Sequence, residues 1–217
     1  MWFLTFIDRW KQKGFLQIFT IYLRYLIGGA FIMAAFGMGK LDGTSNLMGS
    51  MSAPIQELAP IQQFFRVMTD SGLYWKFIGW SQILAGVLLM SQRLARVGAL
   101  MFFVIILNIF VITVAYEFTG TPVVTGLMLL ATIYLLVWDI RSFLPLLIEM
   151  PPHPPARLSI ADHPYWQWLG AVMIALVVTV SWLRIHFLLQ LALPVGVGLL
   201  AFVFFMGLLY KRARAKP

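Results

Sequence analysis

Four polar side chains interrupt the apolar stretches of this sequence. One strongly polar residue lies near the middle of each of the first four long apolar runs: Arg24, Gln82, Asn108 and Thr132. At 1.5 Å of rise per helical residue, each lies about 14–18 Å from one end of its run. Polar groups at that depth of a membrane helix usually face the protein interior. If all four face inward, they form one polar layer that offers hydrogen bonds to a carbonyl or anionic head group.

Arg24 needs a partner, because an unpaired arginine at the centre of a membrane helix costs about 2.5–3.5 kcal/mol on insertion scales. Its side chain should point towards the N-terminal end of its helix. Asp139 follows Thr132 by seven residues and approaches the same level. We therefore predict an Arg24–Asp139 ion pair, or else contact of Arg24 with a ligand head group. Gln82 and Asn108 are the expected further hydrogen-bond partners.

Two charged residues are candidates at the opposite membrane face. Lys40 follows the first apolar run and is either an interface anchor or a group that reaches into an external vestibule. Glu117 ends the third run on the same side, where it is either solvated or meets Lys40. With the residues above, these complete a set of candidate ligand-binding residues: Arg24, Lys40, Gln82, Asn108, Glu117, Thr132 and Asp139.

Composition places these residues in membrane helices. The 217 residues are 61% apolar and 11% charged, with a mean hydropathy of +0.87, whereas soluble domains carry about 25% charged residues. Six apolar runs are long enough to span a bilayer. They lie near 14–37, 73–91, 95–116, 122–147, 165–183 and 187–210. We predict an all-α polytopic membrane protein, with no removable signal peptide.

The basic residues predict the orientation, because cytoplasmic loops of membrane proteins carry the excess of lysine and arginine. A cytoplasmic N-terminus puts most of them inside: Arg9, Lys11, Lys13, Arg93, Arg96, Arg141, Arg157, Lys211, Arg212, Arg214 and Lys216. It leaves Lys40, Arg66, Lys76 and Arg184 outside. An even number of spans then puts both termini in the cytoplasm.

The connecting segments suggest a division of the chain. We predict an interfacial segment at 1–13, a four-helix membrane core at 14–147, a proline-rich cytoplasmic linker at 148–164 and a terminal helical hairpin with a basic tail at 165–217. Within the core, 41–72 is an external connection. Its apolar residues recur at three- and four-residue spacing between Pro54 and Gly72, which predicts an amphipathic helix on or over the bundle.

The core resembles the DoxX family of bacterial membrane proteins. The resemblance is carried by YLRYLIG at 22–28, FIGWSQILAGVLL at 77–89, LNIFVIT at 107–113, TGTPVVTGLMLL at 119–130 and WD at 138–139. It implies a four-helix bundle in the bacterial inner membrane, with relatives linked to quinone-dependent sulfur oxidation or membrane redox complexes. The sequence departs from the family at Gln82, where an acidic residue is frequent.

Two classes of function remain open. The first is a binding or accessory subunit for a quinone-like or other lipophilic ligand, or for a membrane redox partner. The alternative is a small-solute permease or channel whose constriction is the polar layer. An enzyme is less favoured because no nucleophile motif or acid–base pair is visible; if enzymatic, the chain would be a quinone-linked oxidoreductase subunit. With no cysteine and three scattered histidines, we expect no metal site. We expect the bilayer as a partner and no nucleic acid; the sequence is compatible with a homo-oligomer but does not specify the oligomeric state.

Overall fold

The computed structural model describes residues 2–42, 53–146 and 160–214, which fold into helices and the turns between them. Six helices are long and apolar enough to cross a bilayer, as predicted. They are α2 (Gly14–Gly37), α4 (Leu73–Met90), α5 (Ala95–Ala115), α6 (Thr121–Trp138), α8 (Tyr165–Trp182) and α9 (Phe187–Arg214). The protein is therefore an all-α, multi-pass membrane protein.

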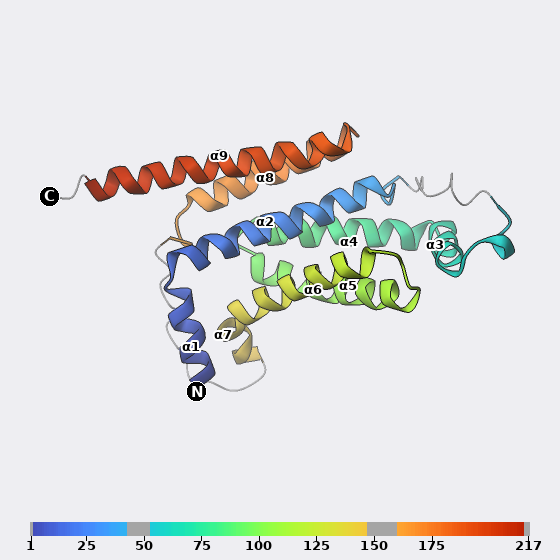
Figure 1. Cartoon of the computed structure of the whole chain (residues 1–217), viewed down its shortest axis with the longest axis horizontal. Coiled ribbons are helices and arrows are strands. Elements are labelled where there is room, and N and C mark those ends of the chain that lie inside the picture. Colours follow the sequence, from blue (N-terminus) through green and yellow to red (C-terminus); the bar gives the residue numbers. More distant parts are fainter. Residues whose placement is uncertain (1, 43–52, 147–159, 215–217) are drawn as a thin grey trace.

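The six long helices run side by side, so that their ends define two faces of the bundle (Figure 1). We call one face the inner end, where α1 (Trp2–Lys11), the α4–α5 turn and α7 (Ile140–Phe143) lie. At the outer end, α3 (Pro60–Asp70) lies across the bundle. The basic residues predict that the inner end faces the cytoplasm. α1 turns steeply away from α2, as an interfacial helix does.

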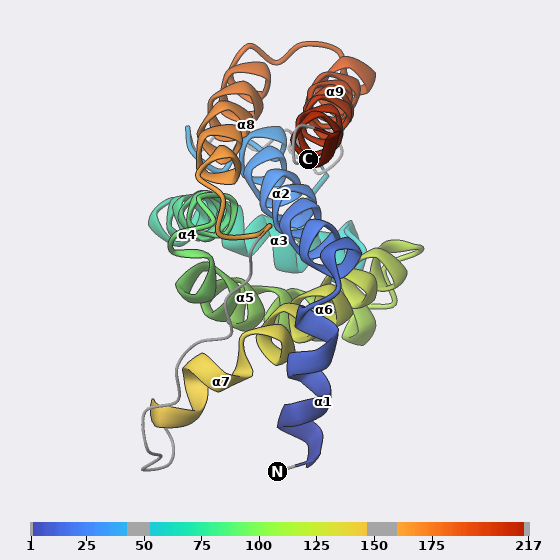
Figure 2. The same cartoon turned by 90° about the vertical axis from the view of Figure 1, so that its left-hand side faces the viewer.

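The helices stack as three antiparallel pairs. Figure 2 shows α8 and α9 in one layer, α2 and α4 in the next, and α5 and α6 in the third. α2 contacts α4 and α8, α4 contacts α5, and α5 contacts α6. α9 contacts mainly α8 and is the least buried of the six. Helices α2, α4, α5 and α6 thus form one packed unit, and the α8–α9 hairpin covers the free side of α2.

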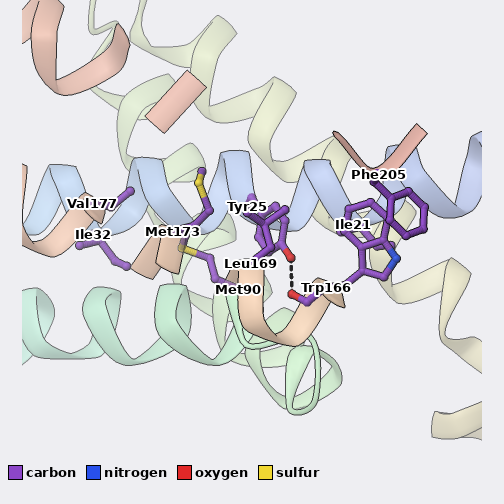
Figure 3. Packing of buried hydrophobic residues seen from close by; sticks show 9 residues of the cluster. All are labelled: Ile21, Tyr25, Ile32, Met90, Trp166, Leu169, Met173, Val177 and Phe205. Atoms are coloured by element: carbon purple, nitrogen blue, oxygen red, sulfur yellow. Dashed lines mark hydrogen bonds between the residues drawn. The ribbon is translucent and has the colours of Figure 1, made fainter. Parts of the chain in front are cut away.

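α2 is the central helix because apolar cores form on both of its sides. One core joins α2 to α8, α9 and the end of α4, and it includes Ile21, Tyr25, Met90 and Trp166 (Figure 3). The Tyr25 hydroxyl donates a hydrogen bond to the backbone oxygen of Trp166 at 2.5 Å. The other core lies between α2, α4, α5 and α6, where the Phe31 ring stacks on that of Phe102.

Two glycines set the distance between α2 and α4. A Cβ on Gly86 would lie 2.6 Å from the Gly28 carbonyl oxygen, and a Cβ on Gly28 would lie 2.9 Å from that of Gly86. The two backbones therefore touch at this crossing, which only small residues allow.

Two boundaries differ from the prediction. The fourth span ends at Trp138, not near residue 147, and α7 and a 3-10 turn at Leu144–Leu146 follow it. The apolar run continues past Asp139, but Asp139 leaves helical geometry (ψ 13°), and Pro145 disfavours a continued helix. The external helix begins at Pro60, not near Pro54, because Leu58 is extended. Residues 43–52 and most of the predicted linker 148–164 lie outside the described residues.

The α8–α9 hairpin is fastened to the core at the inner end. The Gln17 side chain on α2 accepts hydrogen bonds from the backbone N–H groups of Ile160 and Ala161, at 3.3 and 3.1 Å. The Trp166 indole donates to the Ile160 backbone oxygen at 2.7 Å. These bonds position the start of α8 beside α2.

Candidate functional site

The predicted Arg24–Asp139 ion pair is present at the inner end. The Arg24 guanidinium contacts the Asp139 carboxylate at 2.7 Å, and both side chains are nearly buried. A second Arg24 nitrogen donates a hydrogen bond to the Gln92 side chain at 3.0 Å. The predicted partners Gln82 and Asn108 are therefore wrong. The reason is direction: the arginine points towards the inner end, where Gln92 occupies the α4–α5 turn.

Two more cations surround Asp139. The Arg96 guanidinium lies 3.8 Å from its second oxygen. Lys11, at the end of α1, is buried, with its ammonium 5.9 Å from the centre of the Trp138 ring. Burial lowers the pKa of Lys11, and the nearby Asp139 carboxylate opposes that shift. We call Lys11, Arg24, Arg96 and Asp139 the inner ionic cluster. It joins α1, α2, α5 and α6, so its geometry indicates a structural role.

A separate ion pair holds α1 against α7. The Arg141 guanidinium donates two hydrogen bonds to the two oxygens of Asp8. The geometry is bidentate, which is the strongest arrangement of arginine with a carboxylate. Charged side chains at the inner end thus join five elements: α1, α2, α5, α6 and α7.

A cavity of about 830 Å³ occupies the outer half of the four-helix unit. We call it the outer cavity. Its walls come from α2, α4, α5 and α6, and α3 covers it. Apolar and aromatic side chains dominate the lining, among them Phe31, Phe64, Phe65, Trp75 and Ile106. Its volume lies within the range of about 300–1,000 Å³ that holds drug-sized ligands.

Lys40 and Gln82 form the polar group in the wall of the outer cavity. Lys40 is 5% exposed, and its ammonium donates a hydrogen bond to the Gln82 side-chain oxygen at 2.7 Å. The ammonium also lies 5.3 Å from the centre of the Trp75 ring. Gly79 makes room for this lysine, because a Cβ there would lie 2.6 Å from the Lys40 Cβ. The sequence predicts Lys40 to be either an interface anchor or a group that reaches inward, and the structure shows that its side chain reaches inward.

Burial also changes the acidity of Lys40, which lies beyond the end of α2 and outside the spanning segment. Removal from water lowers the pKa of its ammonium from 10.5 to about 8. The group is still mainly protonated at neutral pH. A positive charge therefore faces a largely apolar cavity.

The remaining candidates lie apart from one another. Asn108 lines the outer cavity and is exposed. Thr132 is buried and donates to the Met128 backbone oxygen of its own helix at 2.7 Å. Glu117 is exposed, and no ion pair joins it to Lys40. The predicted single polar layer is therefore wrong.

Long side chains explain why the layer divides. Arg24 extends several ångströms towards the inner end to reach Asp139, while Lys40 extends back from the outer end to reach Gln82. The register of the helices also contributes, because Gly28 lies against Gly86. Arg24 therefore lies one helical turn nearer the inner end than this crossing, and Gln82 lies one turn nearer the outer end.

Gln92 and Lys11 are not predicted as site residues, because both lie outside the apolar runs. The hydroxyl pair of Thr113 and Thr125, 3.0 Å apart between α5 and α6, is not predicted either.

A second, smaller cavity of about 320 Å³ lies between α2, α8 and α9. Its lining is almost entirely apolar, apart from Gln190 and the tyrosines of α2. The Tyr22 hydroxyl donates to the Gly198 backbone oxygen at 2.8 Å, one turn after Pro194 in α9. In the part of the chain that the structure describes, no group of three or more His, Asp or Glu side chains is placed to hold a metal ion.

The fold and the outer cavity define a multi-pass membrane protein with a ligand-sized cavity, whose mainly apolar lining includes the buried Lys40. Comparison with known proteins adds one relative: the chain is 38% identical over 82 residues to the uncharacterized protein YwoB of Bacillus subtilis (strain 168). The match covers 37% of this chain and 52% of that protein, so the chain spans about half the length of the relative it matches. No family model and no solved structure matches the chain.

Proposed function

We propose that this protein binds a lipophilic ligand, quinone-like or another amphiphile, in the outer cavity. The observation that carries the proposal is Lys40, a buried cation in the wall of a cavity of about 830 Å³. Gln82 orients the lysine, and Asn108 adds a further hydrogen-bonding group along the same wall. A few polar groups in a mainly apolar lining are typical of sites for small lipophilic molecules.

The ligand reaches the cavity from the bilayer. Several lining side chains are more than half exposed, including Phe77 (62%), Val104 (67%) and Val124 (58%). These residues lie on spanning helices, so their exposed faces lie against hydrocarbon. A lipophilic molecule can therefore enter sideways, without crossing water.

Binding is better supported than passage of a solute. A buried apolar cluster separates the outer cavity from the inner ionic cluster on all four helices; it includes Ile27 on α2, Leu89 on α4, Phe102 on α5 and Leu135 on α6. Each of these side chains is at most 4% exposed. A channel for a polar solute requires a continuous polar or hydrated path, which this layer interrupts.

We also propose kinship with the DoxX family and a place in a bacterial inner membrane. The four-helix unit of α2, α4, α5 and α6 is the arrangement that the resemblance implies, and YwoB is a bacterial protein. On this proposal the protein acts as a binding or accessory subunit for a membrane redox partner, with the ligand held beneath α3.

Native mass spectrometry of the full chain, purified in a mild neutral detergent, tests the proposed binding. We expect a co-purified amphiphile with wild type. The variant Ala34→Trp places an indole in the outer cavity and should abolish retention. Ala175→Trp is the matched control, because Ala175 is exposed on α8 and lines neither described cavity. Equal loss in both variants, or equal retention, would contradict the proposal.

A further inference from the structure

Lys40 has no carboxylate partner among the described residues. The acidic groups near the outer end lie elsewhere: Asp42 pairs with Arg184 at 2.6 Å, and Asp70 pairs with Arg66 at 3.0 Å. Glu57 and Glu117 are exposed. The sequence of residues 43–52 contains neither Asp nor Glu, so that segment has no carboxylate to offer either.

A buried cation of this kind is stabilised by a counter-charge. Among the described residues, the amide oxygen of Gln82 and the ring of Trp75 are the groups that face the ammonium, and both are neutral. Removing an ammonium from water costs several kcal/mol unless an anion compensates it. The lysine is also held in place, because its Cβ packs directly over Gly79. The wall of the outer cavity therefore presents a fixed positive charge that lacks its anion.

We propose that the ligand of the outer cavity is an anionic amphiphile, whose carboxylate or phosphate head group binds the Lys40 ammonium while its apolar tail fills the cavity. This inference rests on the proposed function and specifies the chemical class of its ligand. The head group also accepts hydrogen bonds from Lys40 protons that Gln82 does not use. The tail contacts the apolar wall down to Phe31 and Ile106.

The depth of the cavity fits a molecule from the outer half of the bilayer. Lys40 lies in the turn that follows the outer end of α2, and the chain there folds back so that its backbone N–H donates to the Ala35 backbone oxygen. Phe31, in the cavity lining, lies six residues before the end of α2 at Gly37, which corresponds to about 9 Å of helix. Half of a hydrocarbon core about 30 Å thick is about 15 Å. The stretch from Phe31 to the end of α2 is shorter than half of the hydrocarbon core, so a ligand bound there stays within the outer half of the bilayer.

The experiment is a binding titration on the full chain in neutral detergent, by isothermal calorimetry. The probes are palmitate and dodecyl phosphate as anions, with methyl palmitate and a decyl-substituted benzoquinone as neutral ligands. We expect at least one anion to bind wild type at least about tenfold more tightly than either neutral probe, since hydrogen bonds to charged groups contribute about 1.5–3 kcal/mol. If palmitate binds more tightly than dodecyl phosphate, the preferred head group is a carboxylate; if dodecyl phosphate binds more tightly, it is a phosphate.

Three variants connect the preference to Lys40. Lys40→Met should lower anion affinity about tenfold or more, whereas Lys76→Met, on an exposed lysine of α4, should leave it unchanged. Gln82→Glu supplies an internal carboxylate to Lys40 and should also weaken anion binding, without loss of thermal stability. That second variant keeps the inference testable if Lys40→Met fails to fold.

The outcomes separate this inference from the proposed function. If a neutral probe binds wild type as tightly as the anions, or if Lys40→Met and Gln82→Glu leave anion affinity unchanged, the anionic class is wrong while the cavity remains a binding site. If no probe binds wild type, the proposed function fails as well.

Discussion

The guanidinium of Arg24 and the carboxylate of Asp139, 115 residues apart in the chain, lie 2.7 Å from each other and join α2 to α6. Both side chains are nearly buried, at 12% and 10% exposure. Asp139 is the anion in contact with Arg24, and Arg96 on α5 lies 3.8 Å from its second oxygen. The pair fixes the inner end of the four-helix unit and leaves the outer end free to form a cavity.

Replacing one residue of this ion pair while the other remains should destabilise the protein strongly. Asp139→Leu leaves Arg24 buried without its anion, and we expect a loss of about 3–5 kcal/mol in the free energy of unfolding. The double variant Arg24→Met, Asp139→Leu should lose less than the sum of the two single variants, because Arg24 is no longer present as a buried cation without its anion. Arg96 and Lys11 still lose the Asp139 carboxylate in this variant, so part of the loss remains. Denaturant unfolding in detergent, followed by tryptophan fluorescence, measures both. A double variant as unstable as the sum of the two single variants would contradict this account.

The crossing of α2 and α4 should be sensitive to a single methyl group. Gly86→Ala places a Cβ 2.6 Å from the Gly28 carbonyl oxygen and 2.9 Å from Ile32, so the helices must separate. We expect a loss of about 1–3 kcal/mol. Gly196→Ala in α9 is the control, because a Cβ there meets no atom within 4 Å. Unfolding midpoints of the two variants should differ, and equal midpoints would show that the contact is not tight.

Stability should depend on pH through Lys40. Its pKa is lowered to about 8 in the folded protein, against 10.5 as its ordinary value. Between these values the unfolded chain retains a proton that the folded chain has released, so stability rises with pH from about 8 to 10.5. The difference in unfolding free energy between wild type and Lys40→Met, measured across that range, isolates this effect. If this difference in unfolding free energy does not change with pH, Lys40 is not desolvated in the folded protein.

The docking of α1 should depend on Asp8 and Arg141. Arg141→Gln removes the bidentate ion pair between α1 and α7, and α1 should then open more often. Limited trypsin digestion reports this opening, with faster cleavage after Arg9 and Lys13 than in wild type. Arg184→Gln breaks an exposed pair with Asp42 at the outer end and serves as the control. Cleavage at the wild-type rate in Arg141→Gln would show that other contacts hold α1.

The sequence predicts the spanning helices well because hydropathy reports the one property that a bilayer demands of each of them. All six helices lie where the apolar runs place them, and the Arg24–Asp139 pair follows from the cost of an isolated charge. The early end of α6 could not be predicted from hydropathy, because apolar residues resume at 143–148, after Arg141 and Ser142.

The outer cavity could be predicted only in part. The periodicity of 55–68 predicts a helix over the bundle, and Lys40 is recognised as a group that could reach inward. The contact between Lys40 and Gln82 depends on a turn after α2 that brings together residues 42 positions apart. Neither hydropathy nor spacing encodes that turn, so Gln82 was assigned to Arg24 instead. The empty volume between four helices likewise depends on packing and not on any one segment.

The most direct test of the central claim is to map where a membrane ligand touches the protein. A palmitate and a decyl benzoquinone, each carrying a photoreactive diazirine on the tail, are irradiated with the full chain in bilayer nanodiscs, and the crosslinked peptides are sequenced. We predict that at least one probe crosslinks to the cavity walls at 30–38, 101–113 and 121–128, and that Ala34→Trp removes these crosslinks. Crosslinks confined to the exposed faces of α8 and α9, unchanged in Ala34→Trp, would contradict a ligand site in the outer cavity.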